Sequence, residues 1–404
     1  MSNNTKHPHE HRNGQARARN RAIETVLTHH GRKPGDQFGV VNTPVYRAST
    51  VLYPDFKTLK NRSQPYVYGR RGTPSSKSVE DVITTLEGGE GSKLAPSGMS
   101  AISCALMSVL ASGDELLISD SAYEPTRMLA DGYLARMGVS TRYFDPRIGG
   151  EIVRMIGKNT RAIMLESPGS LTFELNDIPA ISSAVQGREI SIIVDNTWGT
   201  PLYYNPLALG ANIVVHAGTK MFVGHSDAMF GTITCDTAHW PALEETHGLL
   251  GLCAAPDDCF LAARGLRTLA LRMKEHSARS IKMAQWLEGQ DIVQEVLHPG
   301  LTSHPDHDIF VRDFRGAGSL FSFCLPRANQ AALAAMLDNM ELFGMGYSWG
   351  GFESLILPID LKNKRTSTAW PNDHQIIRIH IGLEDFGELR NDIAAGIARY
   401  KAAM

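Results

Sequence analysis

Short β-rich runs alternate with helical stretches over much of this chain. Apolar residues recur at helical spacing in residues 78–86 and again in residues 100–110. Five apolar runs have the length and composition of strands: 115–119, 161–165, 191–195, 212–215 and 231–235. Strands separated by helices favour a mostly parallel, doubly wound sheet, and ligands of such sheets bind at the carboxyl ends of the strands.

The composition is that of a globular protein. A chain of 404 residues, of which 43% are hydrophobic and 20% charged, can bury a sizeable core, and we expect more than one domain. The net charge of -2 does not favour nucleic acid or an anionic membrane as a partner. Five cysteines without a CxxC pair predict neither a disulfide framework nor a zinc site. Because no apolar run has membrane-spanning length and no secretory signal is evident, we expect a cytoplasmic protein.

The first 36 residues are polar and basic, and we expect a disordered or arm-like segment there. The same arginine-rich, acid-poor composition leaves an organelle transit peptide open. His7, His9 and His11 alternate and could catch a metal ion, but a flexible tail is a poor ligand set, so we expect no metal site.

Two charged residues fall at strand ends of the predicted sheet. Asp195 ends the run SIIVD, and Lys220 follows the next strand after 25 residues, about the length of one helix-plus-strand unit. A structural ion pair is one interpretation of this spacing. The segment 96–100 opens a helix with small residues, so its free N–H groups and its positive dipole end suit a phosphate. Thr219 adds a hydroxyl beside the lysine.

A phosphate site, a nucleophilic amine and a carboxylate are together the contacts that pyridoxal 5'-phosphate requires. The amine attaches to the cofactor, the carboxylate partners the pyridine nitrogen, and the helix start binds the phosphate. The sequence therefore predicts this cofactor. The run GGEGSK at 88–93 lacks the GxxxxGK[ST] spacing of a phosphate loop, and we expect a helix-ending turn there.

From about Val41 to the C-terminus, ordered sequence blocks resemble the cystathionine branch of the fold-type I pyridoxal-phosphate enzymes, the Cys/Met metabolism family. The blocks are YGRRGTP (68–74), LEGGEG (86–91), SAYEP (121–125), LESPGS (165–170), VDNTW (194–198), TKMFVGHSDAMFGT (219–232), RGLRTL (264–269), YSWGGFESL (347–355) and IRIHIGLED (377–385).

The resemblance implies an α/β, fold-type I transferase-like architecture with a mostly parallel sheet. We expect an N-terminal arm at 1–60, a pyridoxal-phosphate-binding large domain at 61–260 and a smaller C-terminal α/β domain at 261–404. A long helical stretch at 264–287 is expected to begin the smaller domain, since apolar residues recur along it at helical spacing.

The resemblance also assigns the catalytic centre. It implies that Lys220 carries the cofactor and acts as general base, and that Asp195 keeps the pyridine nitrogen protonated. Tyr123 is implied to stack on the ring and to relay protons. Arg378 is implied to clamp the substrate α-carboxylate, for which a planar two-pronged donor is well suited. The competing interpretations are a core aromatic at Tyr123 and a solvent-facing Arg378.

Other residues are implied to bind the phosphate or the far end of the substrate. Gly98 and Met99 are implied to give backbone N–H groups to the phosphate, with the hydroxyl of Thr219. Ser348 and Trp349 are implied to line the substrate side, although Trp349 could serve packing alone.

The family pattern also implies contacts between subunits. Tyr68 and Arg70 resemble a pair that reaches the phosphate from the neighbouring subunit, so we expect a homo-oligomer, a dimer of dimers, with shared active sites. The chain departs from the family pattern at Gly218, where a hydroxyl residue is common, and at Met221, where an aromatic residue is common. These departures bear on cofactor affinity.

The reaction implied by the resemblance is α,β-elimination of L-cystathionine to homocysteine, pyruvate and ammonia, a step of methionine biosynthesis. SPGS at 167–170 and YSWGG at 347–351 resemble the β-acting branch of the family. A cysteine desulfhydrase and a γ-lyase or γ-synthase share this scaffold and remain alternatives. A non-catalytic pyridoxal-binding regulator is a remote one, because the 36-residue tail is too short for a DNA-binding module.

Overall fold

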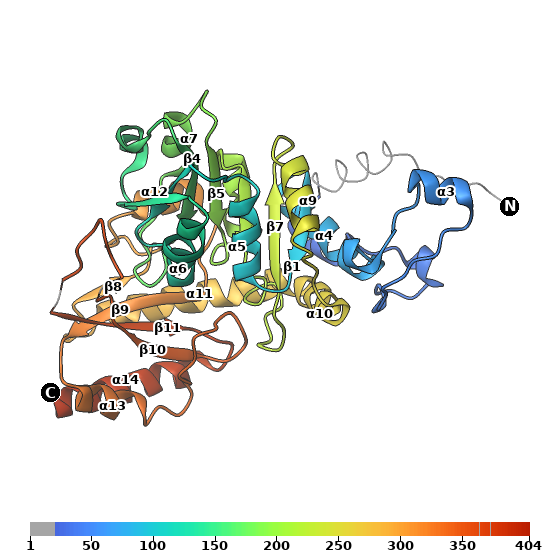
Figure 1. Cartoon of the computed structure of the whole chain (residues 1–404). Coiled ribbons are helices and arrows are strands. Elements are labelled where there is room, and N and C mark those ends of the chain that lie inside the picture. Colours follow the sequence, from blue (N-terminus) through green and yellow to red (C-terminus); the bar gives the residue numbers. More distant parts are fainter. Residues whose placement is uncertain (1–20, 363, 372) are drawn as a thin grey trace.

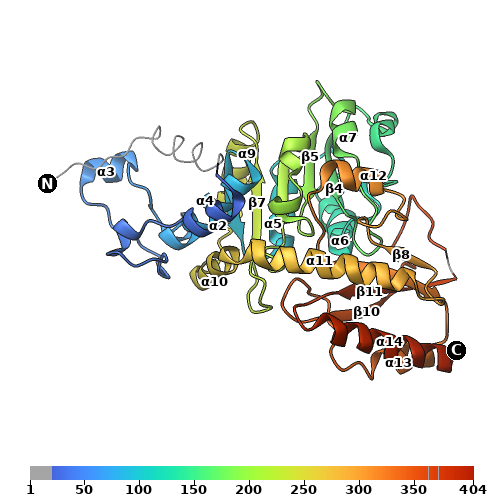
Figure 2. The same cartoon turned by 180° about the vertical axis from the view of Figure 1, so that it is seen from behind.

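Two β-sheets form the body of the molecule, and an N-terminal segment extends away from it (Figures 1 and 2). The computed structural model describes residues 21–362, 364–371 and 373–404. None of the helices in this described part is both long and apolar enough to cross a membrane. The cytoplasmic location remains a prediction.

The larger sheet has seven strands in the order β1-β7-β6-β5-β4-β2-β3. Only β7 runs antiparallel to its neighbours, so the predicted mostly parallel sheet is confirmed. The strands are β1 Gly91–Ala95, β2 Glu115–Ser119, β3 Ser140–Phe144, β4 Thr160–Glu166, β5 Ser191–Asp195, β6 Ile213–His216 and β7 Gly231–Cys235.

Helices and short turns connect these strands. The α-helices before, between and directly after them are α2 Ile23–His29, α3 Phe56–Asn61, α4 Pro74–Glu87, α5 Gly98–Met107, α6 Glu124–Met128, α7 Ile178–Ala184, α8 Thr200–Tyr203, α9 Trp240–Leu249 and α10 Pro256–Arg267. The shorter helical turns are η1 Pro34–Gln37, η2 Gly69–Arg71, η3 Leu129–Leu134, η4 Gly149–Met155 and η5 Pro206–Leu209. Helix α4 begins at a capping box of Thr73 and Ser76 and ends at Gly88, whose φ of 75° suits glycine.

The smaller sheet is antiparallel in the order β10-β11-β9-β8. Its strands are β8 Glu295–Leu297, β9 Leu320–Pro326, β10 Leu355–Ile359 and β11 His374–His380. The accompanying helices are α11 Leu269–Glu288, α12 His307–Asp313, α13 Gln330–Leu337 and α14 Phe386–Ala403. Helix α11 runs between the two sheets, whereas α13 and α14 cover the opposite side of the small sheet (Figures 1 and 2).

Both faces of the large sheet are covered. Neighbouring residues of β5 belong to different apolar clusters, because successive side chains of a strand point to opposite faces: Ile193 packs with α5 residues, and Val194 packs with residues of the small sheet. The core is therefore continuous between the two sheets. The expected domain boundaries remain a prediction.

Two expectations are corrected by the described residues. Helix α2 lies within the segment expected to be disordered or arm-like; it buries Val26 and Leu27, and Leu27 packs in one apolar cluster with residues of α4. The helical stretch predicted at 264–287 is two helices, since α10 ends before Thr268 and α11 begins after it. His7, His9 and His11 lie outside the described residues.

Candidate active site

Lys220 and Asp195 lie where the sequence predicted them, at the carboxyl ends of two neighbouring parallel strands. Asp195 ends β5, and Lys220 follows β6. They do not pair with each other in the described structure. The Lys220 Nζ donates to Ser348 Oγ at 2.7 Å, while Asp195 Oδ1 accepts from the hydroxyl and the backbone N–H of Thr197 at 2.6 and 3.0 Å. The simple ion-pair interpretation is therefore wrong.

The surroundings of Lys220 favour a neutral amine. Burial lowers the pKa of Lys220 to about 8, and the Arg378 cation adds to this, whereas Asp195 opposes it. A neutral amine is both a nucleophile and a proton acceptor, and the lowered pKa lets Lys220 lose its proton and take either role at a lower pH than an ordinary lysine would.

A second carboxyl group, Glu166, lies beside Asp195. Glu166 ends β4 and is paired with Asp195 in the parallel register of β4 and β5. Burial raises the pKa of Glu166 well above its usual range, and the Asp195 charge adds to the rise. Burial also raises the pKa of Asp195, which the Thr197 hydrogen bonds oppose. The pair therefore favours a state in which Asp195 is ionised and Glu166 keeps a proton.

Tyr123 is positioned by Glu166. Its backbone N–H donates to Glu166 Oε2 at 2.6 Å, at the start of α6. The side chain of Tyr123 is 44% exposed, so it is not a core aromatic. Burial of the hydroxyl and the charges of Glu166 and Asp195 raise its pKa, which the Arg378 cation opposes. The Tyr123 hydroxyl therefore holds a proton that it can donate.

The start of α5 offers an anion site close to the lysine. Ser97 caps the helix by accepting from the Ser100 N–H at 3.1 Å. Among the described residues, no hydrogen bond occupies the N–H groups of Gly98 and Met99. A Cβ at Gly98 would lie 2.6 Å from the Cβ of Ala217, so only glycine lets this helix end approach the loop that carries Lys220.

The Thr219 hydroxyl is already engaged within the chain. It donates to the Phe230 carbonyl at 3.1 Å and accepts from the Phe230 N–H at 2.8 Å. To donate to a phosphate, Thr219 has to release the Phe230 carbonyl. The departure at Gly218 has a packing cause, since a Cβ there would lie 2.4 Å from the Phe230 ring. Met221, the other departure, is 1% exposed and packs in the core.

Arg378 is buried on β11 rather than solvent-facing. It is 8% exposed, and its Nη2 donates to the carbonyls of Tyr347 at 3.0 Å and Gly346 at 3.4 Å. Burial lowers its pKa to about 10. In the part of the chain that the structure describes, no carboxylate forms an ion pair with it. A buried cation without a carboxylate partner is suited to an anionic group of a ligand.

The segment after Tyr347 covers Lys220. The Trp349 ring centroid lies 5.8 Å from the Lys220 Nζ, and the same indole packs against the core clusters. Gly350 has a φ of 96°, and a Cβ there would lie 3.0 Å from the Lys220 Cα. Ser348 and Trp349 therefore line the site, with Trp349 also serving packing.

Tyr68 and Arg70 are not brought to this site within one chain. The Arg70 Nη1 donates to the Gly248 carbonyl at 2.7 Å, and its guanidinium lies 5.9 Å from the Tyr68 ring. Tyr68 is 45% exposed. Both residues belong to the segment between α3 and α4, on the side of the molecule away from the small sheet (Figure 1).

The sequence analysis missed Glu166, Thr197 and His216. Glu166 directly follows the strand predicted at 161–165, so the strand-end argument that found Asp195 applied to it as well. The Thr197 hydroxyl accepts from the Ala217 N–H at 2.8 Å and so connects the Asp195 strand end to the Lys220 loop. His216 is paired with the buried Glu87 at 2.5 Å, and its proximity to Asp195 opposes the rise in the pKa of that carboxyl group. No sequence signal identifies the last two contacts.

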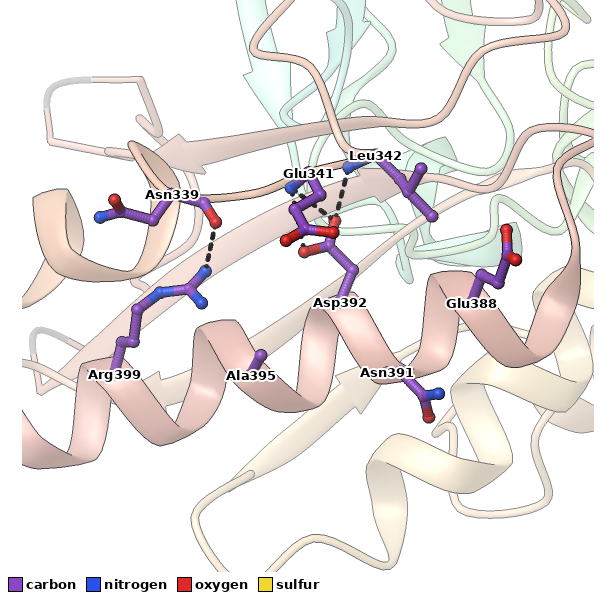
Figure 3. A pocket seen from close by; sticks show the side chains of 8 residues that line it. All are labelled: Asn339, Glu341, Leu342, Glu388, Asn391, Asp392, Ala395 and Arg399. Carbon is purple, nitrogen blue, oxygen red and sulfur yellow. Dashed lines mark hydrogen bonds between the residues drawn. The ribbon is translucent and has the colours of Figure 1, made fainter.

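A separate hollow lies away from these groups. It has a volume of about 420 Å³ and lies between α14 and the segment after α13 (Figure 3). Two of its charged side chains are engaged within the chain, with Asp392 accepting from the Leu342 N–H at 2.8 Å and Arg399 donating to the Asn339 carbonyl at 2.9 Å. This hollow contains none of the groups predicted for catalysis.

The strand-end groups fit pyridoxal 5'-phosphate. Gly98 and Met99 present unbonded N–H groups to a phosphate, Lys220 presents an amine of lowered pKa, and Asp195 presents a buried carboxylate to the pyridine nitrogen. Buried Arg378 completes the set with a cation for a substrate carboxylate.

Comparison with known proteins agrees with this arrangement. The chain is 45% identical to a putative cystathionine beta-lyase of Rhizobium johnstonii, over 95% of this chain and 98% of that protein. It is 39% identical to the cystathionine beta-lyase of Escherichia coli, over 93% and 98%. The solved structure of a cystathionine gamma synthase from Xanthomonas oryzae pv. oryzae matches with a TM-score of 0.88 at 29% identity, over 95% of this chain and 100% of that one. Residues 24–398 match the model of the Cys/Met metabolism PLP-dependent enzymes, and the chain belongs to this family.

Proposed function

We propose that this chain is a carbon–sulfur lyase that cleaves the Cβ–S bond of L-cystathionine. The proposal rests on the proximity of two side chains, the Lys220 amine and the buried Arg378 guanidinium. The pKa of Lys220 is about 8, and the Arg378 cation contributes to lowering it. Such a pair can hold an α-carboxylate and remove the neighbouring Cα proton. The names of the two bacterial relatives support the substrate and the bond.

Each of the groups around Lys220 has one role in cofactor binding, substrate binding or proton transfer. Gly98 and Met99 bind the phosphate through their N–H groups, and Asp195 holds a proton on the pyridine nitrogen. When bound, pyridoxal 5'-phosphate supplies an electron sink for the pair left at Cα. Arg378 holds the α-carboxylate, and Lys220 takes the Cα proton.

The elimination then breaks one further bond. The electron pair of the broken Cα–H bond forms a double bond to Cβ as the Cβ–S bond breaks, and the sulfur leaves as homocysteine thiolate. Lys220 or Tyr123 returns a proton to that sulfur. The remaining three-carbon enamine takes up water and yields pyruvate and ammonia. No oxidant or reductant is consumed.

Trp349 supports β-cleavage over γ-cleavage. γ-Cleavage also requires removal of a Cβ proton, and hence a base that moves along the substrate. Trp349 lies over the Lys220 amine and restricts that movement. The indole would restrict the substrate to a pose in which the Cβ–S bond is aligned to break as the electron pair at Cα moves toward Cβ.

A product assay tests the proposal. Incubation with L-cystathionine is expected to yield pyruvate, ammonia and homocysteine, with weaker action on cystine-like β-thio amino acids. Chromatography of the keto acid distinguishes the alternatives. If 2-oxobutyrate and cysteine are the main products, the chain is a γ-lyase. If cystathionine is inert while cysteine yields sulfide, it is a desulfhydrase.

We also propose that a second copy of the chain completes each site, in a dimer of dimers. The segment before α4 extends from the body (Figure 1). Its apolar side chains Phe38, Leu52 and Phe56 are 104, 85 and 76% exposed. Exposed apolar surface of this kind is typical of an interface with another protein chain. Tyr68 and Arg70 lie on the same segment. If a second copy of the chain covers this surface, Tyr68 and Arg70 of the first chain would lie at the phosphate site of the second.

A further inference from the structure

On the small sheet, three side chains of kinds that commonly bind metal ions lie close together. They are Glu295 in β8, Cys324 in β9 and His374 in β11. One oxygen, the sulfur and one ring nitrogen of these residues all lie within 4.8 Å of one another. His374 lies four residues before Arg378 on β11, whereas Glu295 and Cys324 lie on strands that contain none of the groups described around Lys220.

The register of the strands explains why the three side chains meet. Glu295 is paired directly with Cys324 across β8 and β9, so their side chains share a face. Cys324 is paired with Ile376 on its other side, and His374 lies two residues before Ile376. Because side chains two residues apart point the same way, His374 also lies on this face. Three adjacent strands therefore hold the groups in position.

These groups have little else to bind. The Nδ1 of His374 is buried and has no hydrogen-bond partner within the described ranges, and its Nε2 lies 4.0 Å from Asp373. Cys324 is buried and forms no disulfide. No hydrogen bond occupies the Glu295 carboxylate among the residues that the structure describes. A buried nitrogen without a partner is costly, and an ion between the three groups would satisfy all of them.

The ligand chemistry indicates which ion. A thiolate, an imidazole and a carboxylate together suit Zn²⁺, which binds such atoms at ~2.0–2.3 Å and leaves a fourth position for water. The three ligand atoms then have to approach to roughly 3.5 Å of one another. Glu295 and His374 are each the first residue of their strand, where small movements disturb the least pairing.

The thiol is protonated until an ion arrives. Burial raises the pKa of Cys324 to about 12, and the Glu295 charge adds to the rise. Binding of Zn²⁺ therefore displaces a proton from the sulfur, as at other thiolate sites.

We propose that Glu295, Cys324 and His374 form a zinc site that fastens the edge strand β8 to β9 and β11. The site is independent of the proposed lyase activity. It was not expected from the sequence, because its ligands are separated by long stretches of chain and form no local motif.

Zinc uptake tests the site directly. Metal-stripped, cofactor-loaded full chain without a histidine tag is dialysed against Zn²⁺, and bound zinc per chain is measured by elemental analysis. Wild type is expected to hold one zinc more tightly than Cys324→Ser by roughly tenfold or more. With Co²⁺ as the probe, wild type is expected to show a thiolate-to-cobalt absorption band that Cys324→Ser lacks. Cys235→Ser, which alters another buried thiol, should behave as wild type.

Two further variants keep the test decisive. His374→Ala removes a ligand from the strand end and should also lose the zinc, which matters if Cys324→Ser does not fold. The His7→Ala, His9→Ala, His11→Ala chain should keep it. Zinc affinity unchanged in both Cys324→Ser and His374→Ala would overturn the proposal, and so would zinc lost only with the three N-terminal histidines.

Discussion

At the residue scale, Lys220 is subject to opposing influences. Burial and Arg378 disfavour its charge, while Asp195 favours it, and the balance leaves the amine with a pKa of about 8. The type and place of this residue were predictable, because a lysine and an aspartate after neighbouring parallel strands meet at one edge of a sheet. That Lys220 and Asp195 form no ion pair with each other was not predictable. Lys220 donates instead to the Ser348 hydroxyl, and Asp195 accepts instead from the Thr197 hydroxyl.

The first prediction concerns attachment of the cofactor to Lys220. Lys220→Ala should lack the near-visible absorption of attached cofactor and lose activity by roughly 100- to 10,000-fold or more. Borohydride reduction of wild type should fix the cofactor on the peptide that contains Lys220; label on another lysine would refute the assignment. In cofactor-free wild type, the rate of cofactor uptake should rise with pH and level off above about 8, because only the neutral amine attacks.

The second prediction concerns Glu166 as the residue that positions Tyr123. Glu166→Ala leaves the Tyr123 N–H without its acceptor, a loss of ~1.4 kcal/mol, and should lower kcat/KM about tenfold. Glu166→Gln keeps an acceptor oxygen and mimics the protonated acid, so it should retain most activity. Steady-state kinetics of both variants decide. Equal losses in Gln and Ala would show that the charge of Glu166, rather than its hydrogen bond, is what matters.

At the element scale, the five strands predicted from apolar runs are all present in the large sheet, but β1 and β3 of that sheet were missed. β1 contains Gly91, Ser92 and Lys93, and β3 begins with three polar residues before its two aromatic ones, so neither forms an apolar run. The expected turn at 88–93 is correct at Gly88 and wrong from Gly91 onward. β1 lies at the edge of the sheet and is held there by pairing with β7, a long-range contact that a local pattern does not contain.

The third prediction tests the close approach of α5 to the Lys220 loop. Gly98→Ala places a methyl group 2.6 Å from the Ala217 Cβ and should push the helix start away from the phosphate site. Overpacking of this kind costs ~1–3 kcal/mol, so cofactor affinity should fall roughly tenfold or more. Titration of cofactor-free protein measures it. Gly132→Ala, a helical glycine with open space around it, is the matched control and should bind as wild type does. Equal affinities in the two variants would contradict the argument.

At the scale of the whole molecule, one chain contains Lys220, Asp195, Tyr123 and Arg378 around one point, and holds Tyr68 and Arg70 away from it. The family resemblance assigned all six residues, and in the assembly proposed above a second chain would bring Tyr68 and Arg70 to a phosphate. The segment that contains Tyr68 and Arg70 also exposes Phe38 and Phe56 to solvent, and we propose that a second copy of the chain covers them.

The last prediction therefore mixes two inactive chains. A Lys220→Ala chain and an Arg70→Ala chain, unfolded together and refolded, should form hybrids in which one of the two sites has Lys220 from one chain and Arg70 from the other. With random pairing, about a quarter of wild-type activity should return, because half of the dimers are hybrids and each has one intact site. The control mixes Lys220→Ala with Asp195→Ala. Both residues come from the same chain, so every hybrid site lacks one of them, and no activity should return. If the first mixture stays inactive although mass spectrometry detects hybrids, or if the control recovers equally, the two subunits do not share the site in the way proposed.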